Sequence, residues 1–153
     1  MNLCCEVLKA LDGKTLVTAE SCTGGGIGAA LTAIPGSSSV YKGGVISYTN
    51  WVKHELLLVP QAYLDQFGAV SAPVAEAMAL GARQRMDADI AVSVTGLAGP
   101  GGDDYGNPVG TVYIGYSDQT MTVSEKHIFS GNRDSVRDQA IVAALQLVLK
   151  FHS

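Results

Sequence analysis

The sequence is poor in cysteine and histidine, and this scarcity limits the kinds of site it can build. It has three of each in 153 residues. Cys4 and Cys5 are adjacent and Cys22 stands alone, so no C-x-x-C pair or Cys/His cluster has the spacing of zinc ligands. An odd number of cysteines also argues against a disulfide framework. We therefore expect reduced thiols and no metal centre.

An excess of basic residues and a long apolar run are also missing. Ten Lys and Arg stand against 14 Asp and Glu, a formal net charge of -4, and the basic residues are scattered. This composition argues against a nucleic-acid partner, although an anionic small molecule needs only a local positive pocket. The apolar runs end well short of the roughly 18 residues of a membrane span, and the N-terminus lacks the basic segment of a signal peptide. We expect a cytoplasmic protein with no membrane partner.

What the sequence does contain is an alternation of helix and strand patterns. Helical patterns cover residues 2–11, 25–34, 51–57, 72–86 and 133–151, and strand patterns cover 15–19, 44–49, 88–96, 109–117 and 119–130. Asn50 and Ser71 are predicted as N-caps of the third and fourth helices. Since no linker divides the chain, we predict one α/β domain over residues 1–153, with three layers (α/β/α) and a mixed sheet. The apolar fraction of 47% also allows a homo-oligomer, which we expect.

The stretch TAESCTGGG, residues 18–26, joins a predicted strand to a predicted helix. The first N–H groups of a helix lack intrahelical partners, so an anion or a developing oxyanion can bind there. A hydroxyl such as that of Ser21 could attack a carbonyl group at this point. Alternatively, Ser21 or Thr23 caps the helix and the glycines allow close packing. The stretch is neither a Walker loop nor a G-x-S-x-G or S-x-x-K motif.

A serine nucleophile needs a base, and the three histidines are poorly placed for this role. In SYTNWVK, Tyr48 lies near the end of a predicted strand and Lys53 lies one turn into the next helix. Both can therefore face a pocket at one sheet edge. As a base, Lys53 needs its pKa lowered from about 10.4 towards neutrality, which partial burial can achieve. The alternative is a surface lysine that extends along Trp51 or Leu56.

Two arginines begin the last predicted helix. Arg133 and Arg137 are four residues apart and so share a helix face, where they could hold a phosphate or a carboxylate. They could equally pair with Asp134 and Asp138 on a solvated face. The sequence alone leaves both interpretations open.

The glycine-rich segment 95–110 is longer than most connections in a compact domain. It begins where a buried strand ends, which is where ligand crevices form in open α/β sheets. Asp103 and Asp104 lie in it, but two adjacent acids without a third ligand are weak support for a metal site.

Six segments, taken in order along the chain, closely resemble the CinA C-terminal domain family, whose characterised members are nicotinamide mononucleotide (NMN) deamidases. They are TAESCTGG (18–25), GGVISYTNWVK (43–53), FGAVSAPVAEAMA (67–79), VSVTGLAGPGG (92–102), PVGTVYI (108–114) and FSGNRDSVRDQA (129–140). The resemblance implies hydrolysis of the carboxamide of NMN to nicotinic acid mononucleotide and ammonia, a step of pyridine nucleotide salvage, without a metal or another cofactor.

Carried over by position, the resemblance makes Ser21 the nucleophile and Lys53 its general base, with Tyr48 beside them. It also implies a set of residues that bind the substrate or stabilise the oxyanion: Thr23, Gly24, Gly25, Thr95, Gly96, Ala98, Gly99, Arg133 and Arg137. The phosphate of NMN would be held by the two arginines or by amides of the glycine-rich loop.

Some family members carry this domain behind a larger N-terminal one, and the sequence is expected to be the form without it. Asn107 departs from the lysine or threonine that many members have before the proline, so this position could alter affinity if it touches substrate. A non-catalytic module that binds pyridine nucleotides is the main alternative function. A second alternative keeps hydrolysis but makes Cys22 the nucleophile, since a thiol at a helix N-terminus has a lowered pKa.

Overall fold

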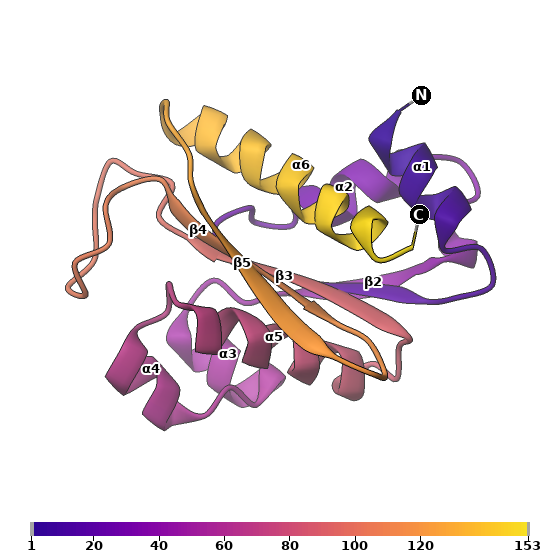
Figure 1. Ribbon diagram of the computed structural model, residues 1–153. Coiled ribbons are helices and arrows are strands. Elements are labelled where there is room, and N and C mark those ends of the chain that lie inside the picture. The colour runs from indigo at the N-terminus through magenta and orange to yellow at the C-terminus, as the bar shows by residue number, and fades with distance from the viewer. Residues whose placement is uncertain (1, 153) are drawn as a thin grey trace.

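A computed structural model of the protein describes residues 2–152 and contains a five-stranded sheet covered by helices on both faces (Figure 1). The helices α1 (Leu3–Ala10), α2 (Gly26–Thr32) and α6 (Arg133–Lys150) cover one face. The helices α3 (Asn50–Leu57), α4 (Gln61–Phe67) and α5 (Ala72–Arg85) cover the other. The predicted three-layer α/β/α architecture is confirmed.

The sheet is mixed, as predicted, with the order β2-β1-β3-β4-β5. Its strands are β1 (Leu16–Glu20), β2 (Tyr41–Ile46), β3 (Ile90–Gly96), β4 (Thr111–Ser117) and β5 (Thr122–Ile128). The first three are parallel, whereas β4 and β5 run antiparallel to their neighbours. The parallel register aligns Glu20 with Ile46 and with Val94. The residues that follow β1, β2 and β3 therefore emerge at one edge of the sheet.

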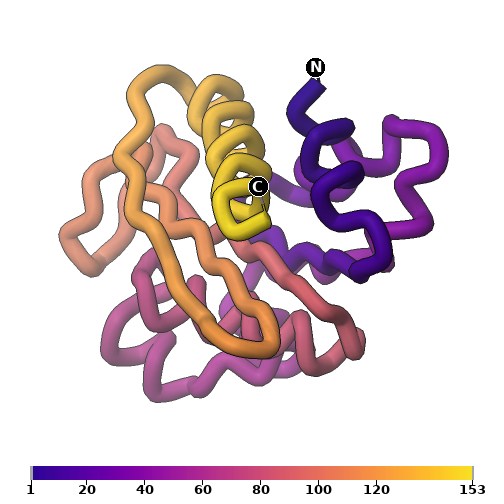
Figure 2. The backbone as a smooth tube through the Cα atoms, turned by 45° about the vertical axis from the view of Figure 1, so that its right-hand side comes forward, coloured from indigo at the N-terminus to yellow at the C-terminus, as the bar shows by residue number. Residues whose placement is uncertain are grey.

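Two apolar cores hold the layers together. Successive strand residues point to opposite faces of a sheet, so Val92 and Val94 pack in the core with α1, α2 and α6. Val17 and Ala91 pack in the second core, with α5 and the end of α3. Figure 2 shows α6 beside α1, with both ends of the chain on this side of the sheet. This two-sided burial explains why β1 and β3 are apolar without alternation.

The bounds of β2 differ from the prediction of a strand over 44–49. Pairing with β1 begins at Tyr41, and the strand ends at Ile46. Gly43 and Gly44, which lie outside or at the limit of the predicted strand, pair with β1. Gly44 is required there because a Cβ would collide with Thr18 Oγ1. Close approach of neighbouring strands therefore explains the glycine inside this strand.

Of the two predicted N-caps, Asn50 is wrong, whereas Ser71 is confirmed in position but makes no capping hydrogen bond. Thr49, not Asn50, caps α3, and its Oγ1 accepts a hydrogen bond from the Val52 amide at 3.4 Å. Ser71 stands at the N-cap position of α5, but its hydroxyl donates to the Gly68 carbonyl instead of accepting from the helix. Helix α4 was not predicted; it follows Pro60 without a side-chain cap.

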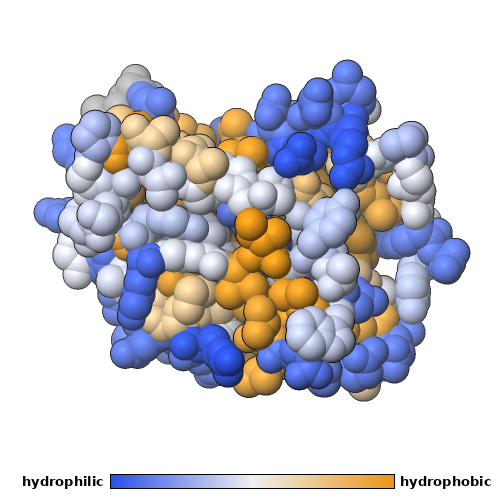
Figure 3. All heavy atoms as spheres, turned by 180° about the vertical axis from the view of Figure 1, so that it is seen from behind, coloured by the Kyte–Doolittle hydropathy of each residue, from blue (hydrophilic) through white to orange (hydrophobic). Residues whose placement is uncertain are grey.

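Apolar side chains gather in a band on the face shown in Figure 3, between hydrophilic margins. Exposed large apolar residues of the β2–α3 region include Ile46, Tyr48, Trp51 and Leu58. None of the helices within residues 2–152 combines the length and the apolar character needed to cross a bilayer.

Candidate active site

The turn after β1 presents Ser21 at the carboxyl edge of the sheet. The Ser21 amide donates to the Val94 carbonyl of β3 at 2.9 Å, and the Gly24 amide closes the turn onto the Ser21 carbonyl at 3.0 Å. Gly24 and Gly25 have φ values of 59° and 94°, in the left-handed region that favours glycine. The glycines that the sequence places after Ser21 are thus required by the turn that holds it.

The N-terminus of α2 is already occupied by a carboxylate of the chain. Glu20 Oε1 accepts from the Ile27 amide at 2.8 Å, and Oε2 accepts from the Gly28 amide at 3.0 Å. Glu20 is 2% exposed, and its Oε1 also accepts from the hydroxyl of Thr23 at 2.7 Å. The sequence argument that the first amides of this helix are free for an anion is therefore wrong. The alternative that Ser21 or Thr23 caps the helix is wrong as well, because Gly25 is the N-cap.

Lys53 and Ser21 are in direct contact. The Lys53 Nζ lies 3.1 Å from Ser21 Oγ and donates to the Ser47 carbonyl at 2.9 Å. Lys53 is 1% exposed, so it is not the surface lysine that the sequence also allowed. The helix α3 begins directly after the edge where β2 ends, and this places Lys53, in its first turn, next to the turn after β1.

Burial changes the pKa values of Lys53 and of the neighbouring Cys22. Loss of solvent lowers the pKa of Lys53 to about 8, because the charged ammonium is disfavoured in the interior. Burial also raises the pKa of the neighbouring Cys22 thiol to about 11. A substantial fraction of Lys53 is therefore a neutral amine near pH 8, whereas Cys22 stays a protonated thiol. This arrangement favours Ser21 over Cys22 as the nucleophile.

Tyr48 lines the same cavity as the Ser21–Lys53 pair and is joined by a hydrogen bond to Arg133. The Arg133 guanidinium donates to the hydroxyl of Tyr48 at 3.2 Å and to the carbonyl of Gly99 at 2.7 Å. Tyr48 is 58% exposed, and among residues 2–152 its hydroxyl has no hydrogen bond to Ser21 or Lys53. Through these two hydrogen bonds Arg133, at the start of α6, links the segment after β2 to the glycine-rich loop.

These groups surround a cavity of about 540 Å³. Of the site residues that the resemblance implied, eight line it: Ser21, Tyr48, Lys53, Thr95, Gly96, Ala98, Gly99 and Arg133. The wall also contains residues that the sequence argument did not select as ligand contacts, among them Asn50, Ala69, Val70 and Tyr105. Asn50 stands between Tyr48 and Lys53 but was interpreted only as a helix cap, whereas Val70 reaches the cavity through the fold of segments far apart in the chain.

Thr23, Gly24, Gly25 and Arg137 are not part of this lining. Arg137 donates from Nε to the Cys22 carbonyl at 3.0 Å and from Nη2 to the Thr23 carbonyl at 3.2 Å. Arg137 therefore holds the backbone of the turn after β1 and does not line the cavity.

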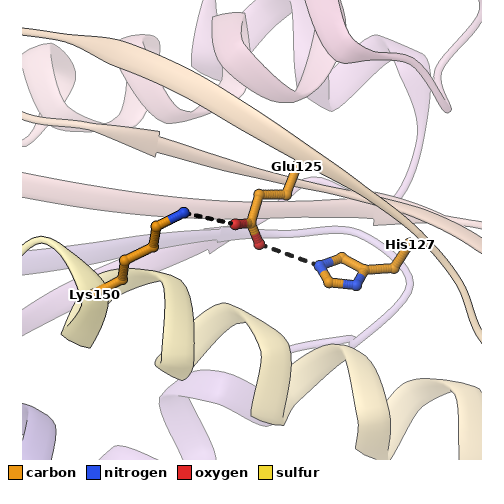
Figure 4. A network of polar contacts seen from close by, with 3 residues as sticks. All are labelled: Glu125, His127 and Lys150. Atoms are coloured by element: carbon orange, nitrogen blue, oxygen red, sulfur yellow. Dashed lines mark hydrogen bonds and ion pairs between the residues drawn. The ribbon is translucent and has the colours of Figure 1, made fainter.

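The arginines also do not pair with the aspartates of α6. Within residues 2–152, the ion pairs join Glu125 to His127 at 3.2 Å and Glu125 to Lys150 at 3.5 Å (Figure 4). The interpretation of Arg133 and Arg137 as members of a solvated ion-pair face is therefore wrong.

The glycine-rich loop is braced by its own polar residues. Asn107 Nδ2 donates to Asp103 Oδ2 at 2.7 Å and to the Val70 carbonyl at 3.1 Å. The Tyr105 hydroxyl donates to the Asp65 carbonyl at 2.9 Å, at the end of α4. Asn107 therefore holds the loop and is not among the residues that line the cavity. Within residues 2–152, no group of three His, Cys, Asp or Glu side chains is arranged to hold a metal ion.

A larger cavity, of about 650 Å³, lies elsewhere, between α5 and the segment from the end of α3 to α4. Its wall is mainly apolar, with Leu58, Tyr63 and Leu80 among the lining residues. It contains no serine, cysteine or lysine. The smaller cavity at the sheet edge is therefore the candidate active site, since it combines a hydroxyl nucleophile, an amine of lowered pKa and a guanidinium.

The chain is similar to an amidohydrolase and to several CinA-like proteins. Nicotinamide-nucleotide amidohydrolase PncC of Pseudomonas putida is 45% identical over 135 residues, which cover 88% of this chain and 84% of that protein. A CinA-like protein of Parasynechococcus marenigrum (strain WH8102) is 50% identical over 135 residues, 87% of this chain. The chain spans only 32% of the length of that relative and 27% of that of a CinA-like protein of Synechococcus sp. (strain CC9311).

Solved structures share the whole architecture. The competence/damage inducible protein CihA from Agrobacterium tumefaciens superposes with a TM-score of 0.95 at 37% identity, over 99% of this chain and 94% of the other. The competence damage-inducible protein A from Klebsiella pneumoniae gives 0.94 at 35% identity, over 97% and 93%. The sequence pattern of the CinA C-terminal domain matches residues 2–152. The resemblance seen in the sequence is thereby confirmed, and the chain belongs to the CinA C-terminal domain family.

Proposed function

We propose that the protein is an NMN amidohydrolase, which converts the carboxamide of NMN to a carboxylate and releases ammonia. The observation that carries the proposal is the contact of Ser21 Oγ with the buried Lys53 Nζ at 3.1 Å. The 45% identity to the amidohydrolase PncC supports the choice of substrate. The cavity of about 540 Å³ falls within the range of small-molecule sites.

In the proposed mechanism, neutral Lys53 takes the proton of Ser21 while Ser21 Oγ attacks the carboxamide carbon. The resulting oxyanion is stabilised by backbone N–H groups of the turn, and the Lys53 ammonium then gives its proton to the leaving nitrogen. Ammonia departs and leaves an ester on Ser21. Water, deprotonated by Lys53, hydrolyses this ester to nicotinic acid mononucleotide and restores the serine. These steps use no metal and no cofactor.

The oxyanion donors are proposed from the amides that remain free. The Gly24 amide already donates to the Ser21 carbonyl, which leaves Thr23 and Gly25 from the predicted set. Within residues 2–152 the amides of Cys22, Thr23 and Gly25 have no hydrogen-bond acceptor. The Cys22 amide is the best placed of the three, because it directly follows the nucleophile, as in hydrolases that use a strand-to-helix turn, and because Cys22 lines the cavity whereas Thr23 and Gly25 do not.

The proposal is tested by incubating the purified protein with NMN and measuring ammonia together with nicotinic acid mononucleotide. We expect equal amounts of the two products. Saturable binding of NMN in calorimetry with no ammonia would contradict catalysis and favour the non-catalytic binding module. Neither binding nor turnover of NMN would reject both functions.

The rate should depend on the protonation of Lys53. A base acts in its neutral form, so kcat/KM is expected to rise with pH through an apparent pKa of about 8, the value to which burial lowers the pKa of this lysine. A pH profile measured from 6 to 10 with NMN below KM checks this expectation. A rate independent of pH over that interval would contradict a lysine base.

Arg133 is proposed to contact the phosphate of NMN, because it lines the cavity and its guanidinium has donors beyond the two in use. Arg133→Ala should raise the KM for NMN about 10-fold, but should change the KM for nicotinamide riboside less, since this substrate lacks the phosphate. Arg85→Ala, an exposed arginine of α5 outside the site, is the control. Equal changes for both substrates would exclude the phosphate contact.

We also propose that the chain forms a homo-oligomer in solution. The exposed apolar residues around β2 and α3, such as Trp51 at 68% and Leu58 at 67%, support this because monomers rarely expose adjoining large apolar groups. Light scattering after size exclusion measures the mass directly, and a monomer at micromolar concentration would contradict this part of the proposal.

A further inference from the structure

Arg137 donates two hydrogen bonds to the backbone of the turn that carries Ser21. Its Nε donates to the Cys22 carbonyl at 3.0 Å, and its Nη2 donates to the Thr23 carbonyl at 3.2 Å. One planar guanidinium therefore holds two successive carbonyl groups, directly after the nucleophile. A Cβ on Gly24 would lie 3.3 Å from Nη2, so the glycine permits this close approach.

Holding a carbonyl also orients the amide on the other side of its peptide bond. In a trans peptide the C=O of one residue and the N–H of the next point in opposite directions. The contact with the Cys22 carbonyl therefore directs the Thr23 amide away from Arg137. The contact with the Thr23 carbonyl does the same for the Gly24 amide, which accordingly donates to the Ser21 carbonyl. This contact holds the Ser21 carbonyl and so fixes the direction of the Cys22 amide, which directly follows the nucleophile, in a residue that lines the cavity.

Glu20 holds the same turn at a second point. Its Oε1 accepts from the Thr23 hydroxyl at 2.7 Å, and its two oxygens accept from the Ile27 and Gly28 amides. Glu20 is 2% exposed and Thr23 is fully buried. Thr23 is thus fixed through its carbonyl by Arg137 and through its side chain by Glu20, so its peptide plane cannot turn without breaking one of these contacts.

We propose that Arg137 and Glu20 are positioning residues that orient the peptide planes after Ser21 so that the Cys22 amide, on the cavity wall, is available to the oxyanion. The proposal rests on the proposed amidohydrolase function. It gives Arg137 a role different from the phosphate contact expected from the sequence. A positioning residue of this kind acts on the transition state, so its loss lowers kcat and leaves KM nearly unchanged.

The first test compares Arg137→Met and Arg137→Lys with the parent protein. Arg137→Met should lower kcat for NMN at least about 10-fold, less than the roughly 10²-fold or more of losing an oxyanion donor outright. KM should stay within about 2-fold, and the preference for NMN over nicotinamide riboside should be unchanged. Arg137→Lys has a single donor centre and should recover only part of kcat. Glu20→Gln should show the same loss confined to kcat.

Arg83→Met is the matched control, because Arg83 is also partly buried and donates through Nε, but to Ser117 Oγ on β4. It should lower Tm as Arg137→Met does and leave kcat unchanged. A raised KM for NMN with unchanged kcat in Arg137→Met would overturn the proposal in favour of a phosphate ligand. An equally large loss of kcat in Arg83→Met would show that the loss in Arg137→Met comes from general destabilisation, and would overturn the proposal.

The second test does not depend on the substrate. A fluorophosphonate reacts with an activated serine: a bond forms from Ser21 Oγ to phosphorus, the P–F bond breaks, fluoride leaves and Lys53 takes the hydroxyl proton. The phosphoryl oxygen needs the same donors as an oxyanion, so labelling of Ser21 should be at least about 10-fold slower in Arg137→Met than in the parent. This difference is expected even if NMN is not the substrate. An unchanged labelling rate would overturn the positioning role and leave the proposed function intact.

Discussion

Replacing Ser21 with alanine is expected to lower ammonia release from NMN by about 10³-fold or more, because the reaction loses the atom that forms the acyl intermediate. The fold should persist. Ser21 is held by its backbone, through its amide on Val94 and its carbonyl on Gly24, and both hydrogen bonds survive the change. The hydrogen bond between its hydroxyl and Lys53, which alanine cannot make, is worth about 1 kcal/mol of stability. Product assays and circular dichroism on the same preparation check the two halves of this expectation.

Cys22→Ala is the control for the choice of nucleophile. Cys22 also lines the cavity, but burial raises the pKa of its thiol to about 11, so almost no thiolate is present near neutral pH. We expect the variant to keep most of its activity. An inactive Cys22→Ala together with an active Ser21→Ala would show that the nucleophile had been assigned to the wrong residue.

The sequence predicted the reactive pair because both members lie at the ends of regular elements. Ser21 directly follows a buried strand, and Lys53 lies one turn into a helix that follows another. Parallel strands place such ends at one edge, so short-range patterns indicated that Ser21 and Lys53 could share a pocket, but left a helix cap and a surface lysine as alternatives. The family resemblance pointed to the same residues. The burial of Lys53 could not be read from its neighbours, since Trp51 and Leu56 suggested a surface position equally well.

The supporting residues were not predictable, for a different physical reason. The role of Glu20 has no local signal, because only the folded turn shows that its carboxylate takes the amides of α2. Arg137 was expected to face a ligand because it shares a helix face with Arg133. Its partners, Cys22 and Thr23, are more than 110 residues away in the chain. Local spacing says nothing about contacts between α6 and the turn after β1.

The predicted start of α3 and the predicted bounds of β2 were wrong where local sequence preference does not decide between neighbouring residues. Thr49 and Asn50 are both good N-cap residues, and the sequence offered no means of choosing between them. In the folded chain β2 ends at Ile46, and the Thr49 hydroxyl accepts the hydrogen bond from the Val52 amide. The predicted strand began at Gly44, whereas β2 begins at Tyr41, and Gly44 lies inside it, where a Cβ would collide with Thr18 Oγ1.

Lys53→Met is expected to abolish turnover and at the same time to stabilise the protein. Methionine has nearly the same length as lysine but no proton acceptor of useful basicity, so general base catalysis is lost and kcat should fall by at least about 10²-fold. Lys53→Arg tests whether charge alone is sufficient: arginine stays protonated at any working pH, and it should be as inactive as the methionine variant. An active Lys53→Arg enzyme with the pH profile of the parent would remove Lys53 from the mechanism and make Tyr48 the next base to examine.

The gain in stability follows from the buried charge. The pKa of Lys53 falls from 10.5 to about 8 on folding, so the unfolded chain binds the proton more tightly than the folded one. Below pH 8 both states are protonated, and the folded state carries the full penalty, about 3 kcal/mol.

Between pH 8 and 10.5 the folded lysine releases its proton first, and the parent's free energy of unfolding rises with pH from this source. Methionine removes the penalty but also lacks the hydrogen bonds to Ser21 and Ser47, each worth about 1 kcal/mol, so a net gain of about 1 kcal/mol is expected at pH 7. Urea unfolding of both proteins at pH 7 and pH 10 measures the difference, which should be larger at pH 7. A methionine variant less stable than the parent at pH 7 would mean that the lysine is not held as a destabilised ammonium, and the lowered pKa on which the base assignment depends would have to be abandoned.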